Sequence, residues 1–247
     1  MTTVTTPAPR GRRRMGVEER RRQLIGVALD LFGRRSPEDV SLDDIATAAG
    51  ISRPLVYHYF PGKQGLYAAA LHRAADDLVS RFDEPREGPF GERLLRVVKR
   101  FFDFLDEHGP GFAALVRGAP AHTGTGGASA VLDGVREAAY ERMLAHLDAS
   151  HNPPPRLQLV VRSWVALAES TARVWLDGRR IPRSEVELQL VHGFVALAAV
   201  SASHDAEMAG LLARVLAGAP SDGPFGELAE QLGLLGAGAG GAAGGYR

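Results

Sequence analysis

One segment, residues 41–67 (SLDDIATAAGISRPLVYHYFPGKQGLY), constrains the fold of this chain more than any other. Its first part carries Leu42, Ile45 and Ala49 at the three- and four-residue spacing that places apolar side chains on one face of a helix. Gly50 then ends this helix, because glycine readily takes the left-handed conformation found at helix C-termini. The segment therefore predicts two short helices joined by a tight turn, followed by the start of a third.

The helix starts in this segment carry their own signals. Ser41 precedes Asp44 by three residues, which is the spacing of a capping box. Ser52 can cap the second helix, and Pro54 is tolerated in its first turn. The second helix of such a helix-turn-helix unit can lie in the major groove of DNA. The side chains that it exposes are therefore the first candidates for a binding function: Arg53, Tyr57, His58 and Tyr59, with Lys63 just beyond.

These exposed side chains have the chemistry of DNA contacts. The Tyr57 hydroxyl suits a phosphate oxygen, and its ring can pack against a sugar or a thymine methyl group. The Arg53 guanidinium can reach guanine O6 and N7 in bidentate fashion. Lys63 opens the next helix, where its charge and the free N-terminal amides can clamp one phosphate. The plainer interpretation is that the aromatic residues only fill a small core. We favour it for Phe60, and we expect Val56 to face inward.

Charge is distributed unevenly along a chain whose formal net charge is zero. Residues 1–37 hold nine arginines against three acidic residues, a net charge of +6, so the remainder carries −6. A basic arm beside a helix-turn-helix indicates contact with a polyanion, here through Arg12 and Arg13. The alternative is a solvated tail without a partner. In either case we expect residues 1–16 to be disordered.

The motif AxxAGIS followed by PLVYHYFPGKxxLY, with LIGVALDLF upstream, resembles the DNA-binding domain of the TetR family of bacterial transcriptional regulators over residues 18–72. Ser36 stands where the family usually has glycine, Ser41 where threonine is usual, and Gly65 where an acid is common. These departures leave the DNA face intact. The resemblance implies phosphate contacts from Tyr57 and Lys63. The residues that we expect to contact DNA are Ser41, Ser52, Arg53, Leu55, Tyr57, His58, Tyr59 and Lys63, together with Arg12 and Arg13.

The rest of the chain shows helical periods separated by polar, proline-rich or glycine-rich breaks. No segment alternates like a strand, so we expect an all-α fold class. The expected helices span 17–34, 63–82, 90–107, 112–116, 131–147, 156–176, 184–203 and 211–216, with a turn at 108–111 and a flexible loop at 118–128. The chain then divides into a basic arm (1–16), an N-terminal three-helix helix-turn-helix domain (17–64), a larger C-terminal helical bundle for ligand binding and dimerisation (65–235) and a disordered Gly/Ala tail (236–247).

Several other classes of function find no support in the sequence. Cysteine is absent, which excludes disulfides, thiolate zinc sites and cysteine catalysis. Gly236, Gly238 and Gly241 satisfy GxGxxG only within the low-complexity tail, and neither GxSxG nor HExxH occurs. We therefore expect no catalytic residues, no metal and no cofactor. No run of about 18 apolar residues indicates a membrane span. No apolar stretch follows the N-terminal arginines, so we expect a cytoplasmic protein without a secretory signal.

The two predicted helices at 156–176 and 184–203 are more apolar than one core face needs. Contiguous apolar surface of this size marks an interface. We therefore expect these helices to pair with those of a second copy in a homodimer. The expected interface residues are Val161, Leu167, Trp175, Leu190, Phe194 and Val195.

The resemblance also implies an effector cavity in the C-terminal bundle, because members of the family usually release DNA when a small molecule binds there. The expected lining is Phe101, Phe104, Phe112, Arg117, Tyr140 and Trp164. Glycine-rich turns at 109–111 and 118–127 would provide its entrance. The plainer alternative is a fully packed core whose polar residues form salt bridges, for example Glu169 with Arg173.

Together these features predict a homodimeric regulator, a repressor that a small-molecule effector releases from a palindromic operator in double-stranded DNA. The alternative is an α-helical ligand-binding or signalling protein whose helix-turn-helix serves protein contacts. The basic arm and the face from Arg53 to Lys63 count against that alternative. An enzyme is a third option, and it lacks any candidate site.

Overall fold

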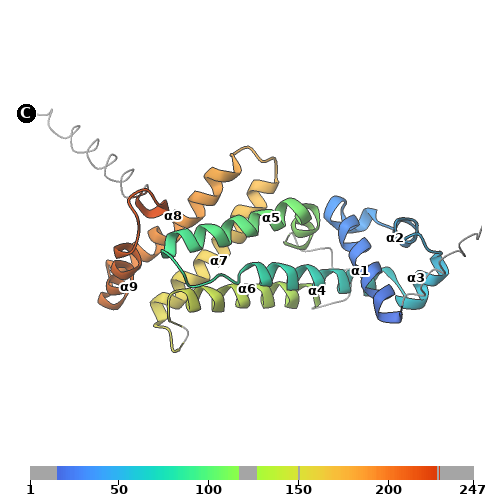
Figure 1. Ribbon diagram of the computed structural model, residues 1–247, viewed down its shortest axis with the longest axis horizontal. Helices are drawn as coiled ribbons and strands as arrows, with labels where there is room; N and C mark the ends of the chain where they lie inside the picture. The colour runs from blue at the N-terminus through green and yellow to red at the C-terminus, as the bar shows by residue number, and fades with distance from the viewer. Residues whose placement is uncertain (1–15, 117–126, 150, 227, 229–247) are drawn as a thin grey trace, which may run out of the picture.

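The computed structural model describes residues 16–116, 127–149, 151–226 and 228, and within these ranges every regular element is a helix. Figure 1 shows an elongated molecule with a small helical domain at one end and a larger bundle at the other. The N-terminal domain comprises α1 (Val17–Arg34), the 3-10 turn η1 (Pro37–Asp39), α2 (Leu42–Ala49), α3 (Arg53–Tyr59) and the start of α4 (Lys63–Arg81). The bundle comprises the rest of α4 with α5 (Phe90–Val116), α6 (Gly127–His146), α7 (Pro155–Leu176), α8 (Arg183–Ala202) and α9 (Ala206–Ala217). The predicted all-α class is confirmed.

The unit formed by α2 and α3 is built as its sequence predicts. The Ser41 hydroxyl accepts from the Asp44 backbone N–H at 3.1 Å, and the Asp44 carboxylate accepts from the Ser41 backbone N–H at 2.8 Å. These two bonds complete the capping box. Gly50 has φ 65° and ψ 35°, the left-handed conformation that ends α2. Val56 and Phe60 are buried in a small core, so α3 rests on a packed support.

Helix α4 belongs to both parts of the molecule. Leu66 and Ala70, in its first half, lie in the small N-terminal core, whereas Leu78 lies in the core of the bundle. α4 packs along α1 and α6, and Figure 1 shows it running from the small domain into the bundle beside α6. A displacement at its bundle end therefore reaches the helix-turn-helix through one continuous helix.

The core of the bundle forms where α5, α7 and α8 pack together, with α9 against α8. Phe102, Leu157 and Phe194 are among its fully buried side chains. By length and hydropathy α8 meets the criterion for a membrane-spanning helix. One side of it packs in the bundle, however, where buried Glu187 pairs with Arg183 at 2.6 Å. Burial against neighbouring helices accounts for the apolar residues on this side, such as Leu190 and Phe194.

Helix α5 is longer than predicted. The expected turn at 108–111 is wrong, because these residues continue α5, which also absorbs the separate helix expected at 112–116. Gly109 lies against α7, where an added Cβ would stand 2.9 Å from Leu176 Cδ2. This glycine therefore allows close helix packing and does not reverse the chain. Most of the expected 118–128 loop lies outside the described residues, as do the 1–15 arm and the 236–247 tail, and α6 already begins at Gly127.

Candidate functional site

Arg53 begins α3 with an exposed guanidinium that is held in place on two sides. Its Nη1 donates to Asp43 Oδ2 on α2 at 2.9 Å, and its Nη2 donates to the Tyr57 hydroxyl at 3.3 Å. The hydrogen bond with Tyr57 and the charge of Asp43 raise the pKa of Arg53. The side chain is therefore a fixed positive charge, with further N–H groups to offer a base edge or a phosphate.

The other predicted DNA contacts on α3 differ in exposure. Tyr57 and His58 are exposed, whereas Leu55 and Tyr59 are partly buried. The rings of His58 and Tyr59 meet edge to face, with centroids 5.1 Å apart. Arg21 of α1 donates to the Tyr59 carbonyl at 3.2 Å, which adds a basic side chain beside the C-terminal end of α3. The sequence alone does not reveal this neighbour, because it depends on how α1 crosses α3.

Lys63 lies at the start of α4, where its Nζ donates to the Glu38 carbonyl at 3.2 Å. Gly62 precedes it as the N-cap and offers no side chain to the first-turn amides. Ser52 occupies the N-cap of α3, but its hydroxyl makes no capping hydrogen bond. The Ser41 hydroxyl is already used in its capping box. Lys63 and Ser52 therefore keep donors for an anion, while the structural role of Ser41 is to begin α2.

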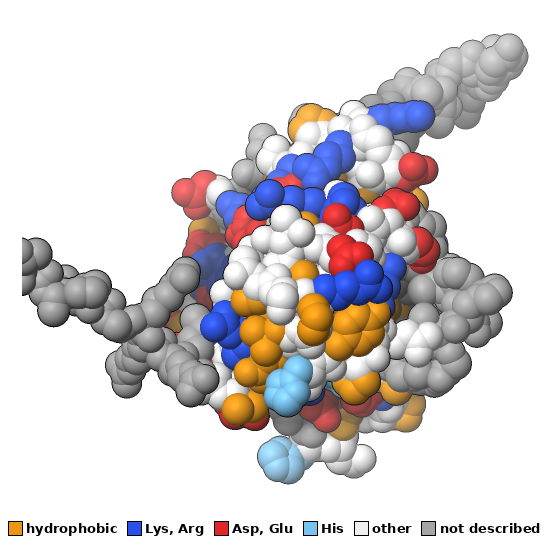
Figure 2. Space-filling model, turned by 90° about the vertical axis from the view of Figure 1, so that its right-hand side faces the viewer, with side chains coloured by type: hydrophobic (Ala, Val, Ile, Leu, Met, Phe, Trp, Pro, Cys, Tyr) orange, Lys and Arg blue, Asp and Glu red, His pale blue; other side chains and the backbone are white. Residues whose placement is uncertain are grey.

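Figure 2 views the end of the molecule that the N-terminal domain forms. Lys and Arg side chains form a band across this end, interspersed with some Asp and Glu, and hydrophobic side chains gather beside the band. A polyanion that approached this end would therefore meet positive charge next to aromatic and aliphatic groups. Arg12 and Arg13 of the predicted arm lie outside the described residues.

A cavity of about 90 Å³ lies inside the bundle, between α4, α5, α6, α7 and α8. Its apolar lining is Leu78, Phe82, Leu94, Val97, Val98, Phe101, Leu132, Val135, Ala139, Met143, Trp164, Val165, Ala168 and Leu190. Arg136, Arg142, His146 and Glu169 complete the wall. Because an apolar cavity that holds a benzene-sized molecule measures about 150 Å³, even a ligand of that size would have to move the lining side chains here. We call this space the bundle cavity.

Arg136 and Glu169 form a two-bond ion pair in the wall of the bundle cavity. Arg136 Nε and Nη2 donate to the Glu169 carboxylate at 2.8 and 2.9 Å. These hydrogen bonds from Arg136 to Glu169 raise the pKa of Arg136. The expected pairing of Glu169 with Arg173 is wrong, since Arg173 donates to the Ser170 hydroxyl at 3.4 Å. Sequence reasoning missed Arg136 because α6 has only a weak apolar face from which to infer its orientation.

Two of the six predicted lining residues, Phe101 and Trp164, line the bundle cavity. Phe104 points to another face of α5 and lines a second cavity near α1 and α4. Tyr140 is buried, and its ring packs under the Arg162 guanidinium, 3.9 Å from the ring centroid, outside the bundle cavity. The side chain of Phe112 and all of Arg117 lie outside the described residues.

Five of the six predicted interface residues face the core of their own chain. Val161, Trp175, Leu190, Phe194 and Val195 are buried within one copy, whereas Leu167 is 39% exposed. α8 is apolar over much of its circumference, so periodicity does not separate its inner from its outer face. In α7 the buried residues follow the three- and four-residue spacing of a helical stripe. The exposed large apolar side chains of α7 and α8 are Leu159, Leu167, Val174 and Val200. We call this set the α7–α8 outer face, and of the predicted residues it includes Leu167.

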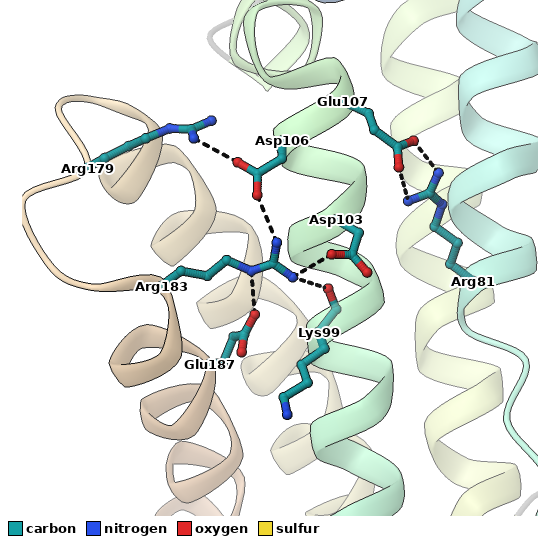
Figure 3. Close-up of polar contacts among 8 residues, drawn as sticks. All are labelled: Arg81, Lys99, Asp103, Asp106, Glu107, Arg179, Arg183 and Glu187. Carbon is teal, nitrogen blue, oxygen red and sulfur yellow. Dashed lines mark hydrogen bonds and ion pairs between the residues drawn. The ribbon is translucent and has the colours of Figure 1, made fainter.

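Ion pairs hold α5 on two sides, as Figure 3 shows. On one side, Arg183 at the start of α8 donates to Asp103 at 2.7 Å and to Asp106 at 2.8 Å. On the other side, Arg81 of α4 pairs with Glu107. α5 is thereby tied both to the helix that enters the N-terminal domain and to α8.

Asp77, Glu107 and His108 bring three potential metal-ligand atoms within 4.8 Å of one another. Arg81 lies among them and pairs with both carboxylates, at 2.8 Å for Asp77. Its guanidinium offsets one of their two negative charges and occupies the space between them. The group therefore acts as an ion-pair network between α4 and α5.

Comparison with known proteins agrees with this arrangement. Residues 24–70 match the bacterial regulatory proteins of the tetR family, and residues 90–197 match the tetracyclin repressor-like C-terminal domain. A crystal structure of a tetR-family transcriptional regulator from Streptomyces coelicolor is 67% identical to this chain, with a TM-score of 0.86. The match covers 90% of this chain and 100% of that one.

Two relatives from Mycolicibacterium smegmatis carry names of regulators. The HTH-type transcriptional activator FasR is 28% identical over 179 residues, which cover 70% of this chain and 81% of FasR. The HTH-type transcriptional regulator EthR is 40% identical over 114 residues, 44% of this chain and 52% of EthR, so the chain spans about half of that relative. Both the helix-turn-helix and the bundle thus have counterparts among DNA-binding regulators that are not enzymes. This chain belongs to the TetR family of bacterial transcriptional regulators.

Proposed function

We propose that this regulator is a homodimeric cytoplasmic repressor that leaves a palindromic operator when a small apolar effector fills the bundle cavity. The path of α4 from the N-terminal domain into the bundle supports this proposal. Lys63 begins the helix beside the predicted DNA face, and Leu78, near the other end, lines the bundle cavity. A molecule that displaces Leu78 therefore acts on the helix that carries Lys63. The shift in DNA binding that it produces is limited by the difference between its affinities for the DNA-bound and the released protein.

On the DNA side, α3 supplies the contacts that distinguish sequences. Arg53 is oriented by Asp43 and Tyr57 at the protein surface, so a guanine edge can replace the Asp43 carboxylate as its acceptor. His58 and Tyr59 lie on the same helix and are the further candidates for base or backbone contacts. Lys63 and the first amides of α4 bind one phosphate and fix the register of α3 in the groove.

A second copy provides the second recognition helix. One helix-turn-helix reads few base pairs, whereas two related by a dyad read half-sites about one helical turn or more apart. The α7–α8 outer face offers apolar surface for this pairing, with Val174 68% and Val200 65% exposed. Exposed apolar surface of this kind is typical of an interface between subunits.

The lining of the bundle cavity supports one class of effector. It favours a mainly apolar molecule with one or two polar groups. Among the described residues, the arginines in its wall are Arg136 and Arg142. Arg162 instead pairs with Glu137 at 2.9 Å. An anionic group on the effector would compete with Glu169 for Arg136.

A thermal-shift screen of small apolar compounds, with and without a carboxylate, tests this function. Compounds that raise Tm should also release the protein from its operator. The matched control is Ala168→Leu, which fills part of the bundle cavity without touching the DNA face. This variant should bind the operator as the wild type does and lose both the stabilisation and the release. If the filled variant is still released by the same compounds, the effector binds elsewhere.

The direction of regulation needs a separate measurement, since one relative is named an activator. A reporter gene is placed behind an operator that has been selected from random duplexes for binding to this protein. Its expression should be weak in the presence of the protein and strong when a compound found in the screen is added. Expression that rises with the protein alone would show activation in place of repression.

A further inference from the structure

A second cavity, of about 60 Å³, lies where the N-terminal domain meets the bundle. Its wall combines Phe32 of α1, Tyr67 and Ala74 of α4, Phe104 of α5 and Val131 of α6. It is therefore built from both domains, unlike the bundle cavity. We call it the junction cavity.

Close contact between α1 and α5 frames the junction cavity. Gly33 of α1 lines the cavity, and a Cβ added there would stand 2.8 Å from the Glu107 carbonyl oxygen. Gly33 therefore lets the two helices approach more closely than any other residue would allow. A molecule in the adjacent cavity touches the helices of both domains and is sensitive to their spacing.

His108 gives the junction cavity a polar group without a partner. Its Nδ1 is buried and makes no hydrogen bond with any of the described residues. This atom lies beside α1, 3.4 Å from the position of a Cβ on Gly33. Nε2, on the opposite side of the ring, lies 3.8 Å from Glu107 Oε2. A neutral imidazole carries its proton on one nitrogen, and the nearby carboxylate favours the Nε2–H tautomer. Nδ1 is then a buried acceptor, and leaving it unpaired costs stability.

We propose that the junction cavity is a second ligand site, which takes a small apolar molecule with one hydroxyl, such as a one-ring phenol, whose O–H donates to His108 Nδ1. Apolar side chains from four helices receive the ring. The cavity volume, about 60 Å³, is smaller than the roughly 150 Å³ of a cavity that holds benzene, so even a one-ring molecule enters only if the lining side chains move apart, and larger molecules are excluded. Leu78, Leu132 and Val135 separate it from the bundle cavity, since all three line both spaces. The proposal goes beyond the effector assigned to the bundle cavity and does not depend on it.

Titration of the full-length protein with phenol and with benzene, followed by calorimetry and by ligand-observed NMR, tests this site. Phenol should bind about tenfold more tightly than benzene, the factor that corresponds to one net hydrogen bond of typical strength. His108→Phe keeps an aromatic ring and removes the acceptor, so phenol should then bind no more tightly than benzene. Equal affinities in the wild type, or no phenol binding by the folded wild type, would overturn the proposal.

Two cavity-filling variants locate the bound phenol. Ala74→Leu fills the junction cavity, and Ala75→Leu does so from the neighbouring position if the first variant folds poorly. Ala168→Leu fills only the bundle cavity and is the matched control. Phenol binding should be lost in the Ala74→Leu and Ala75→Leu variants and retained in Ala168→Leu. Retention in a folded Ala74→Leu or Ala75→Leu variant, or loss in Ala168→Leu, would contradict the assignment. If no effector binds in the bundle cavity, the expected results of these phenol experiments do not change.

Discussion

Arg53 and Lys63 are both engaged in the free protein, with the Asp43 carboxylate and the Glu38 carbonyl respectively. Both contacts lie at the surface, where ion pairs and hydrogen bonds compete with water and contribute little to stability. DNA that binds Arg53 and Lys63 would therefore replace only weak contacts with Asp43 and the Glu38 carbonyl. The sequence predicts the two basic side chains, because a position on a helix-turn-helix determines exposure. It does not predict their partners, because these depend on how α2 and η1 fold back beside them.

The buried histidines give the fold a defined pH dependence. Burial lowers the pKa of His108 and of His146 below the usual value of 6.5, while Glu107, Asp77 and Arg81 around His108 have smaller and partly opposing effects. Below pH 6.5 the unfolded chain therefore binds more protons at these two sites than the folded chain does. The free energy of unfolding should be unaffected by them above that pH and should decrease as the pH falls towards the lowered values.

This pH effect is measurable by thermal unfolding between pH 7.5 and 5. The Tm of the wild type should fall over this range, and it should fall less in the double variant His108→Gln/His146→Gln. Asp44, whose pKa the Ser41 hydrogen bond lowers below 3.8, loses its contribution only at more acidic pH and so does not interfere. Identical pH profiles for the two proteins would contradict a neutral, buried state of these histidines.

Among the helices, periodicity and capping signals predict the positions of elements better than their orientations. The limits of α2 follow from an apolar stripe, the Ser41 cap and the Gly50 break, which are local features. The 108–111 segment is mispredicted because glycine permits close packing as well as turns, and only the neighbouring Leu176 decides between these roles. The buried side of α8 is likewise unpredictable, because its composition is apolar nearly all round.

The capping box at the start of α2 predicts a difference between two serines. Ser41→Ala removes the hydroxyl that accepts from the Asp44 amide and should lower the free energy of unfolding by about 1 kcal/mol. Ser52→Ala is the matched control, because Ser52 also precedes a helix of this unit but makes no side-chain capping bond. Urea unfolding of both variants measures the difference. Equal losses would show that the box at Ser41 contributes nothing specific.

Two glycines of α1 should respond in opposite directions to the same substitution. Gly33→Ala places a methyl group 2.8 Å from the Glu107 carbonyl oxygen and should destabilise the protein by about 1–3 kcal/mol. Gly26 has no neighbour within 4 Å of an added Cβ, so Gly26→Ala should stabilise the helix by up to about 1 kcal/mol. Thermal unfolding distinguishes the two signs. If Gly33→Ala raised the free energy of unfolding, α1 and α5 would be able to move apart without losing stability.

For the molecule as a whole, the division into a helix-turn-helix domain and a bundle can be predicted from the sequence, whereas the cavities cannot. A cavity is what remains after side chains from distant segments pack. Phe101, Arg136 and Trp164 come from three helices and meet only in the folded bundle. Aromatic content suggests Phe101 and Trp164, which line the bundle cavity. It also suggests Tyr140, whose ring is instead covered by Arg162.

The α7–α8 outer face should determine the oligomeric state. Val200→Asp and Leu167→Asp place a charge on this face, which would be buried without a partner in a dimer. Each should convert the dimer to a folded monomer that no longer binds a palindrome with high affinity. Val17→Asp is the matched control, because Val17 is similarly exposed but lies at the start of α1. Light scattering at micromolar concentration measures the mass. A wild-type monomer, or dimeric variants, would contradict this interface.

Selection of duplexes from a random DNA pool, followed by fluorescence anisotropy over a range of salt concentrations, tests whether the protein recognises a palindromic operator through α3 and Lys63. The selected sequences should be palindromic. The log–log salt slope should correspond to about 0.9 per phosphate contact. Lys63→Ala should weaken binding to all duplexes alike and reduce that slope, whereas Arg53→Ala should also relax the preference at one position of each half-site. A folded protein that selects no sequence at low salt, or that binds DNA equally well after both substitutions, would contradict the account.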